Sequence, residues 1–365
     1  MPNNTWIPSK CANLVVGPTR WSSIGVISDI GLKNSERILQ IGIIERIILD
    51  RVDGKNSISD IRKKISESGI QISDERILKV LTKLAFFGAI NRPFTIDEGL
   101  QDVDKQATQS PRALPDQITI QTSYRLLSMW SQMSWLAHPV ALLCLLFLGI
   151  LSFISLLLSV PTALKTLTNC TWPQIIAGIT FSLLWLAFTT IMHENSHAAF
   201  FHAYTKREPY LALSRLGIFI MPNTHMPGSH LMSTKQRFKT LIAGPLTSMV
   251  LAAAPVIFLL TTEIPLIKAI AATCIVLDST LICLMFSPFP NTDGTRIIET
   301  IASVDQLHYV SYLFYSRRNH LRLPSGLPTP TRLVVQVTPA LLLLAIIFWS
   351  IIVIWAIRLI FHSGL

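Results

Sequence analysis

Apolar residues in this chain gather in five stretches that contain no Asp, Glu, Lys or Arg. A helix needs about 20 apolar residues to cross the hydrocarbon core of a bilayer. Four of the stretches are long enough, and the shortest is interrupted by Asp278 and then continues as STLICLMFSPF. The pattern predicts a mainly α fold, a polytopic membrane helix bundle of about five spans. The stretches are residues 126–164, 166–192, 240–262, 269–277 and 333–357.

The chain ahead of these stretches has isoleucine and leucine at helical spacing among charged residues. Three such stripes predict three short helices. Ser73 suits the N-cap of the third helix and Gly88 its end, and AFFGAI around that glycine suits a short strand. Helices followed by a strand indicate a small winged-helix-like α+β domain. The stripes are Ile43, Ile44, Ile47 and Ile48; Ile58, Ile61 and Ile65; and Ile77, Leu78, Leu81 and Leu84.

These patterns divide the chain into three regions. Residues 1–95 are the winged-helix-like domain. Residues 96–137 contain Pro111 and Pro115 and end in an aromatic-rich approach to the first span, so they are interpreted as a linker and an interfacial segment. Residues 138–365 are the membrane domain.

Composition and charge agree with a membrane protein. Only 14% of the 365 residues are charged, whereas soluble domains carry about 25%. Basic residues account for the net charge of +10 and gather in the loops after the second and fourth spans. Positively charged loops stay in the cytoplasm, which predicts a cytoplasmic N-terminus. Because membrane topology explains the basic charge, we expect no nucleic-acid partner. The five cysteines show no paired spacing, so we expect no disulfide framework and no cysteine-based zinc site.

The candidate chemistry lies in HENSH, His193 to His197, at the end of the second apolar stretch. Residues i and i+4 of a helix lie one above the other, about 6 Å apart along the axis. Both imidazoles can therefore reach one Zn²⁺ at about 2.0–2.1 Å. Glu194 projects to a neighbouring side, where it can accept a proton from water, as in the H-E-x-x-H arrangement of zinc hydrolases.

A catalytic zinc takes a third protein ligand and keeps one position open. His202 is too close along the chain for the longer H-E-x-x-H-x-x-G-x-x-H spacing, which also needs glycine where this chain has Phe200. Glu263 is expected at the opposite membrane surface. Asp293 follows the fourth span, which runs in the same direction as the second, so the two ends should meet. The sequence therefore predicts Asp293 as the third ligand.

Three motifs occur in order: HENSH, then AGPLTS at residues 243–248, then SPFPNTDG at residues 287–294. Together they resemble the site-2 protease family of intramembrane zinc metalloproteases, over about residues 175–294. The resemblance implies that His193, His197 and Asp293 bind one Zn²⁺ per chain and that Glu194 is the general base. It also implies that the Gly-Pro pair of the second motif packs a core helix close to the site.

The same resemblance carries expectations about surroundings and substrate. It implies a bacterial cytoplasmic membrane, an active site toward the cytoplasm, and a peptide or membrane-protein substrate in contact with the lipid bilayer. The chain departs from the family at Ser248, Met285 and Ser287, where asparagine is common. These positions concern how a substrate strand is held rather than zinc ligation.

Residues 20–95 are similar to PqqD-type winged-helix domains, which recognise leader segments of ribosomally made precursor peptides. The similarity rests on the helix pattern and the Asp53-Gly54 turn. Such domains capture a peptide as an added strand on a sheet edge. The alternative is a small regulatory or stabilising module.

Three functions stay open on these grounds. The first is a zinc endopeptidase that cuts a precursor peptide brought by the front domain. The second is the same enzyme acting on a membrane-anchored regulator. The third is a non-catalytic membrane component for peptide binding or export, with a structural metal.

Asp278 and the remaining histidines have other interpretations. An acid within a span is either neutral and hydrogen-bonded to Ser or Thr of a neighbouring helix, which we favour here, or it lines a polar path. Histidines in the cytoplasmic loops are expected to be surface or interface residues. These are His225, His230, His308 and His320.

Overall fold

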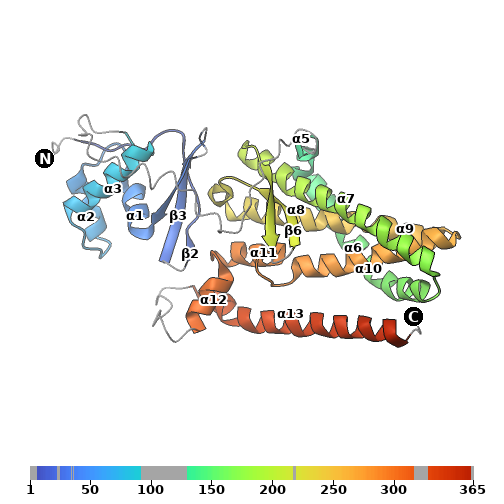
Figure 1. Ribbon diagram of the computed structural model, residues 1–365. Helices are drawn as coiled ribbons and strands as arrows, with labels where there is room; N and C mark the ends of the chain where they lie inside the picture. The colour runs from blue at the N-terminus through green and yellow to red at the C-terminus, as the bar shows by residue number, and fades with distance from the viewer. Residues whose placement is uncertain are drawn as a thin grey trace. The chain divides into compact units, whose positions relative to one another are not determined.

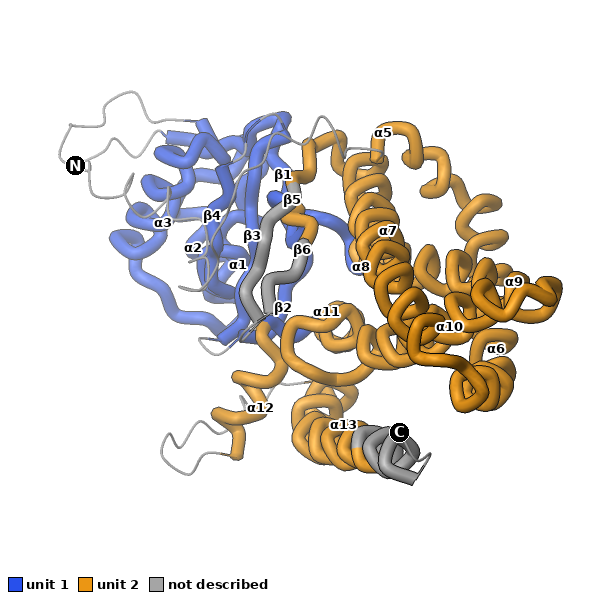
Figure 2. Tube along the Cα trace, turned by 45° about the vertical axis from the view of Figure 1, so that its right-hand side comes forward, with its two compact units in different colours: residues 1–117, 227–234, 303–305 blue, residues 118–226, 235–302, 306–365 orange. Residues whose placement is uncertain are grey.

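The computed structural model describes residues 6–22, 25–33, 35, 37–91, 130–216, 219–315 and 328–362. It forms two compact units, which Figure 2 colours separately. Unit 1 holds residues 1–117 with Pro227–Thr234 and Ser303–Asp305, and unit 2 holds the rest. Residues 96–129 of the predicted linker, and His320, lie outside the described residues.

The sheet of unit 1 precedes its helices in the chain (Figure 1). The central strand β3 (Gly25–Leu32) pairs antiparallel with β1 (Leu14–Val16), β2 (Arg20–Ser22) and β4 (Ile38–Gly42). The register puts β1 and β2 in succession along one side of β3 and β4 along the other. Ile30, for example, has partners in both β1 and β4.

The outer edge of β2 is covered by the segment Ser303–Asp305, which belongs to the same unit. The Trp21 amide donates to the Ser303 carbonyl at 2.8 Å, and the Asp305 amide donates to the Trp21 carbonyl at 2.6 Å. The neighbouring Arg20 guanidinium is buried and forms an ion pair with Asp29 at 3.0 Å. An edge strand that is paired in this way offers no free backbone groups to other chains.

Three amphipathic helices complete unit 1: α1 (Ile43–Arg51), α2 (Ile58–Ser66) and α3 (Asp74–Phe87). Ser73 caps α3, with its hydroxyl accepting from the Arg76 amide at 3.3 Å. Gly88 ends α3 in the left-handed region at φ 88°, which suits glycine because it has no Cβ. The predicted stripes of α2 and α3, except Leu78, lie in one core with β3 and β4.

The three predicted helices, the Ser73 cap and the Gly88 stop are confirmed. The predicted strand at AFFGAI is wrong. The helix α3 continues to Phe87 because its apolar stripe extends into this segment, and Ile90 forms only an isolated bridge with Lys10. The strands of this α+β unit come from the residues ahead of α1 instead.

Unit 2 is a bundle of long apolar helices, and within the described residues five are long and apolar enough to cross a membrane. These findings confirm the mainly α class and support an integral membrane protein. Many large apolar side chains of α6 and α7 point outward, as expected for a lipid-facing surface. The candidate spans are α6 (Pro139–Thr168), α7 (Trp172–Thr205), α8 and α9 (Thr234–Leu251 and Ala253–Thr261), α10 (Pro265–Phe286) and α13 (Thr329–His362).

Shorter elements connect these helices. The segment after α7 forms the hairpin of β5 (Tyr210–Leu216) and β6 (Phe219–His225). The strand β6 packs against α7. The other elements are α5 (Trp130–Met133), η2 (Ser134–Ala137), η3 (Ser229–Leu231), α11 (Asp293–Ala302) and α12 (Leu307–Tyr315).

The helices α7 and α10 pack closely along their length. A Cβ at Gly178 would lie 2.5 Å from the Thr273 hydroxyl oxygen, so glycine permits this approach. Asp278 is buried on α10, and one of its carboxyl oxygens accepts a hydrogen bond from Trp185 Nε1 at 2.9 Å. The expected hydrogen bond to a neighbouring helix is present, but the donor is a tryptophan and not the expected Ser or Thr.

Candidate metal centre

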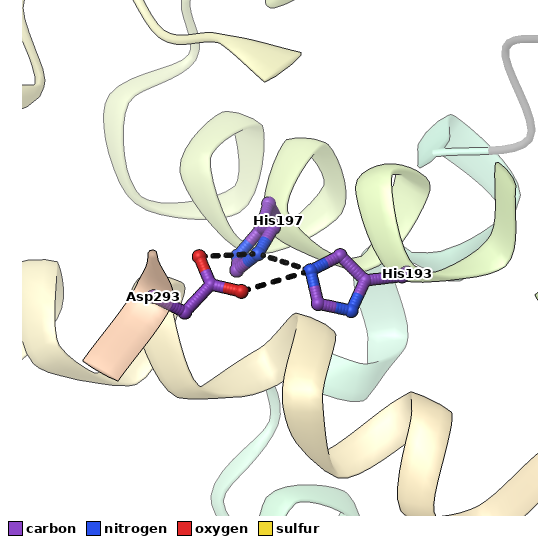
Figure 3. Close-up of side chains that lie close together, drawn as sticks. All are labelled: His193, His197 and Asp293. Atoms are coloured by element: carbon purple, nitrogen blue, oxygen red, sulfur yellow. Dashed lines mark hydrogen bonds and ion pairs between the residues drawn. The ribbon is translucent and has the colours of Figure 1, made fainter. Parts of the chain in front are cut away.

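His193 and His197 lie one turn apart on α7, and each residue is only 4% exposed. Their Nε2 atoms are 3.1 Å apart, and the rings meet edge to face with centroids separated by 4.7 Å. Both nitrogens therefore point at the same small volume (Figure 3). The i, i+4 spacing produces this convergence because such residues share one helix face.

Asp293 reaches the same volume from a distant part of the chain, as Figure 3 shows. Its Oδ2 lies 3.0 Å from His193 Nε2, and its Oδ1 lies 3.5 Å from His197 Nε2. Possible ligand atoms of these three residues all lie within 4.8 Å of one another. The structure thus brings together the three residues that the sequence predicts as ligands.

The two rejected candidates lie elsewhere. His202 stacks on Trp130, and its Nδ1 is 3.0 Å from the Arg207 carbonyl oxygen. Glu263 is solvent-exposed and forms an ion pair with Lys268 at 2.8 Å. Among the described residues, His193, His197 and Asp293 are the group of three whose ligand atoms could share a metal ion.

The second ring nitrogens of both histidines have partners that fix their orientation. His197 Nδ1 lies 2.7 Å from the Thr240 carbonyl oxygen. A carbonyl only accepts, so Nδ1 carries the proton and Nε2 keeps its lone pair. His193 Nδ1 lies 3.0 Å from Ser248 Oγ. Such outer partners hold metal-binding imidazoles in position and select their tautomer.

Gly244 on α8 allows this close approach of α8 to α7. A Cβ built on Gly244 would lie 2.7 Å from His193 Nε2 and would overlap His197 Nε2 as well. These are the two nitrogen atoms that face Asp293. Any side chain at this position would therefore occupy the space where the three candidate ligands converge.

A tight turn presents Asp293 at the start of α11. Asn291 adopts φ 67°, and the Thr292 hydroxyl accepts from the Thr295 amide at 3.3 Å in the manner of an N-cap. A Cβ at Gly294 would lie 2.5 Å from the Phe286 carbonyl oxygen, so glycine allows the turn to fold back on the end of α10.

The surroundings of Asp293 favour its charged form. Burial raises the pKa of the carboxyl, but when the imidazoles are protonated, the charge of His197 and hydrogen bonds from His193 and His197 outweigh burial and hold this pKa well below its usual value. The first turn of α11 adds the positive end of a helix dipole. An ionised carboxylate is the form that binds a metal cation.

Glu194 is half-buried on α7 beside the candidate ligands. Its Oε2 accepts a hydrogen bond from the Thr224 amide of β6 at 2.6 Å. The Thr224 hydroxyl also donates to the Glu194 carbonyl at 3.0 Å. Sequence reasoning missed Thr224 and Thr240, since the Thr224 amide and the Thr240 carbonyl are backbone groups that leave no side-chain signature.

Two imidazoles and one carboxylate form a donor set that suits a divalent cation such as Zn²⁺. Three protein ligands leave the fourth tetrahedral position for water or substrate, as catalytic zinc requires. Glu194, which follows His193 on α7, supplies a carboxylate that can transfer protons. The arrangement can therefore support metal-assisted hydrolysis.

Removing the Ser248 hydroxyl tests the outer partner of His193. We expect Ser248→Ala to lower zinc affinity about 10-fold, because outer-shell partners of metal-binding histidines typically contribute about 10- to 100-fold. Competition titration with a chelating dye measures the change. Ser279→Ala is the matched control, since the Ser279 hydroxyl bonds only the Ile275 carbonyl within α10. Equal affinities for the two variants would contradict the role of Ser248.

No family model, curated protein or solved structure matches the chain.

Proposed function

We propose that the chain is a zinc-dependent intramembrane endopeptidase of the site-2 protease type. The observation that carries the proposal is the convergence of Asp293, at the start of α11, with His193 and His197 of the membrane-length helix α7, on which Glu194 follows His193 directly. A buried cluster of this composition is costly to place in a membrane protein unless it serves a function.

The proposed reaction is hydrolysis of a peptide bond. A zinc ion held by the three residues supplies Lewis-acid activation of water and of the scissile carbonyl. Glu194 takes one proton from the attacking water and later delivers it to the leaving amine, so the carboxylate is regenerated at the end of the cycle. His197 keeps the tautomer that the Thr240 carbonyl sets, and Ser248 holds the ring of His193 in place.

The proposed substrate is a ribosomally made precursor peptide captured by unit 1. Support comes from the α+β character of the unit and from β4, which among the described strands pairs with β3 alone. An extended peptide can add to such an edge through main-chain hydrogen bonds. The proposed orientation places the N-terminus and the site toward the cytoplasm, because the basic loops flank the same membrane face.

Site-specific photocrosslinking tests this capture. A photoreactive residue at the exposed Gln40 of β4 is expected to crosslink a co-expressed precursor peptide. The same probe at the exposed Lys63 of α2 is the control. Equal crosslinking at both positions would favour the alternative enzyme, which cuts a membrane-anchored regulator and uses unit 1 only to modulate access.

The remaining alternative is a membrane peptide-binding or export component with a structural metal. Metal removal separates it from an enzyme. With the purified protein in detergent and a fluorogenic peptide library, cleavage should cease on treatment with phenanthroline and return with stoichiometric Zn²⁺ but not with Ca²⁺. Cleavage that is insensitive to the chelator, or no cleavage of any peptide, would contradict the proposed function.

A further inference from the structure

Thr224 of β6 is bonded to the residue that the proposed function assigns as general base. Its amide donates to Glu194 Oε2 at 2.6 Å, and its hydroxyl donates to the Glu194 carbonyl at 3.0 Å. Thr224 is only 3% exposed, so both bonds are shielded from water. Hydrogen bonds to a charged acceptor are shorter and stronger than neutral ones.

The orientation of β6 explains why this amide is available. Thr224 is paired with Leu211 of β5, but its N–H is bonded to Glu194. Amides of a strand alternate between its two sides, so position 222 faces the same outer side. Position 222 is proline and has no N–H. Of positions 222 and 224, which face the outer side of β6, only Thr224 therefore has an amide that can donate to α7.

We propose that Thr224 is a positioning residue, which orients the Glu194 carboxylate by holding Oε2 so that Oε1 faces the reacting water. The inference rests on the proposed function. A carboxylate on a two-carbon side chain has several rotamers. Fixing one oxygen restricts these rotamers, so that the other oxygen is held in position to accept the proton. The hydroxyl bond to the Glu194 carbonyl fixes β6 to the same turn of α7.

Substitutions at Thr224 test the contributions of its amide bond and its hydroxyl bond separately. Thr224→Ser keeps both donors and should retain kcat within about twofold. Thr224→Val removes only the hydroxyl and should lower kcat about 3- to 10-fold. Thr224→Pro removes the amide donor and should lower kcat about 10- to 100-fold. KM and zinc content should stay at wild-type values, because neither bond reaches a ligand or a substrate.

Proline is tolerated in a strand where its missing N–H faces away from the ladder, as at position 222. A second measurement covers the case in which Thr224→Pro does not fold. Site-resolved amide hydrogen exchange compares wild type with Glu194→Ala, which removes the acceptor. The Thr224 amide should exchange at least about tenfold faster in the variant. Amides of Asn223 and His225, which face β5 by the two-residue alternation, should not change.

The outcomes distinguish this inference from the proposed function. Unchanged exchange at Thr224 in Glu194→Ala, or wild-type kcat in a folded Thr224→Pro, would overturn the positioning role while protease activity stands. Faster exchange in a protein that cleaves no peptide would overturn the proposed function and leave the Thr224–Glu194 contact established. A parallel loss of zinc in the Thr224 variants would also overturn the positioning role.

Discussion

Replacing Gly244 with alanine is expected to abolish metal binding and, with it, peptidase activity. The added methyl group would lie 2.7 Å from His193 Nε2 and would overlap His197 Nε2. Since close-packed interiors have little room to relax, either α8 moves outward or the two imidazoles turn away from Asp293. Loss of an outer partner alone costs about 10- to 100-fold in metal affinity, so displacement of two ligands should cost at least about 100-fold.

Metal analysis of the purified variant measures this effect. Gly42→Ala is the matched control, because a Cβ at Gly42 has only the Glu45 carboxylate nearby, at 4.0 Å. The control should keep wild-type zinc content. A Gly244→Ala protein with full zinc content and activity would show that the space between α7 and α8 is not where the metal binds.

Replacing Glu194 with glutamine is expected to lower kcat by about 10²- to 10⁴-fold while zinc stays bound, since general acid–base groups contribute about this much. Glutamine has the same shape and keeps an oxygen that can accept from the Thr224 amide. It does not accept a proton from water at neutral pH. The variant therefore removes proton transfer and leaves the candidate ligands His193 and His197 in place.

Single-turnover cleavage assays and metal analysis of the same sample measure the two effects separately. Glu263→Gln is the control, because its carboxylate is 91% exposed and pairs only with Lys268. Cleavage by Glu194→Gln at the wild-type rate would exclude Glu194 as the base. Loss of zinc from this variant would show that Glu194 supports the metal rather than the proton transfer.

The membrane helices could be predicted because lipid imposes a simple requirement on the sequence. Each span needs a long apolar run without charge, and each predicted run overlaps a described helical segment of membrane length. The three helices of unit 1 could also be predicted, because their isoleucine stripes repeat at the helical period.

The sheet of unit 1 was missed because its strands carry little local signal. β1 and β2 are three residues each, and β3 is buried from Ile27 to Gly31 without the alternation that marks a half-buried strand. The pairing of β3 with β4 depends on contacts that form in the folded chain, and no local residue pattern indicates it. The prediction of a strand at AFFGAI is wrong because the helical stripe of α3 continues through the aromatic residues of this segment.

Some residues of the candidate site could be predicted from the sequence, and others could not. His193 and His197 could be paired from their spacing, and Asp293 could be added because parallel spans bring their ends together. The Thr240 carbonyl and the Thr224 amide could not be predicted, since every residue has these groups and only the fold places them. The close approach at Gly244 likewise depends on how α8 packs on α7.

The central claim is that His193, His197 and Asp293 bind one metal ion together. Metal content of purified wild type, measured beside His197→Ala, tests it most directly, with His202→Ala as a control from the same helix. We expect about one zinc per chain in wild type and in His202→Ala, and almost none in His197→Ala. Wild-type protein without metal, or His197→Ala that retains one zinc per chain, would contradict it.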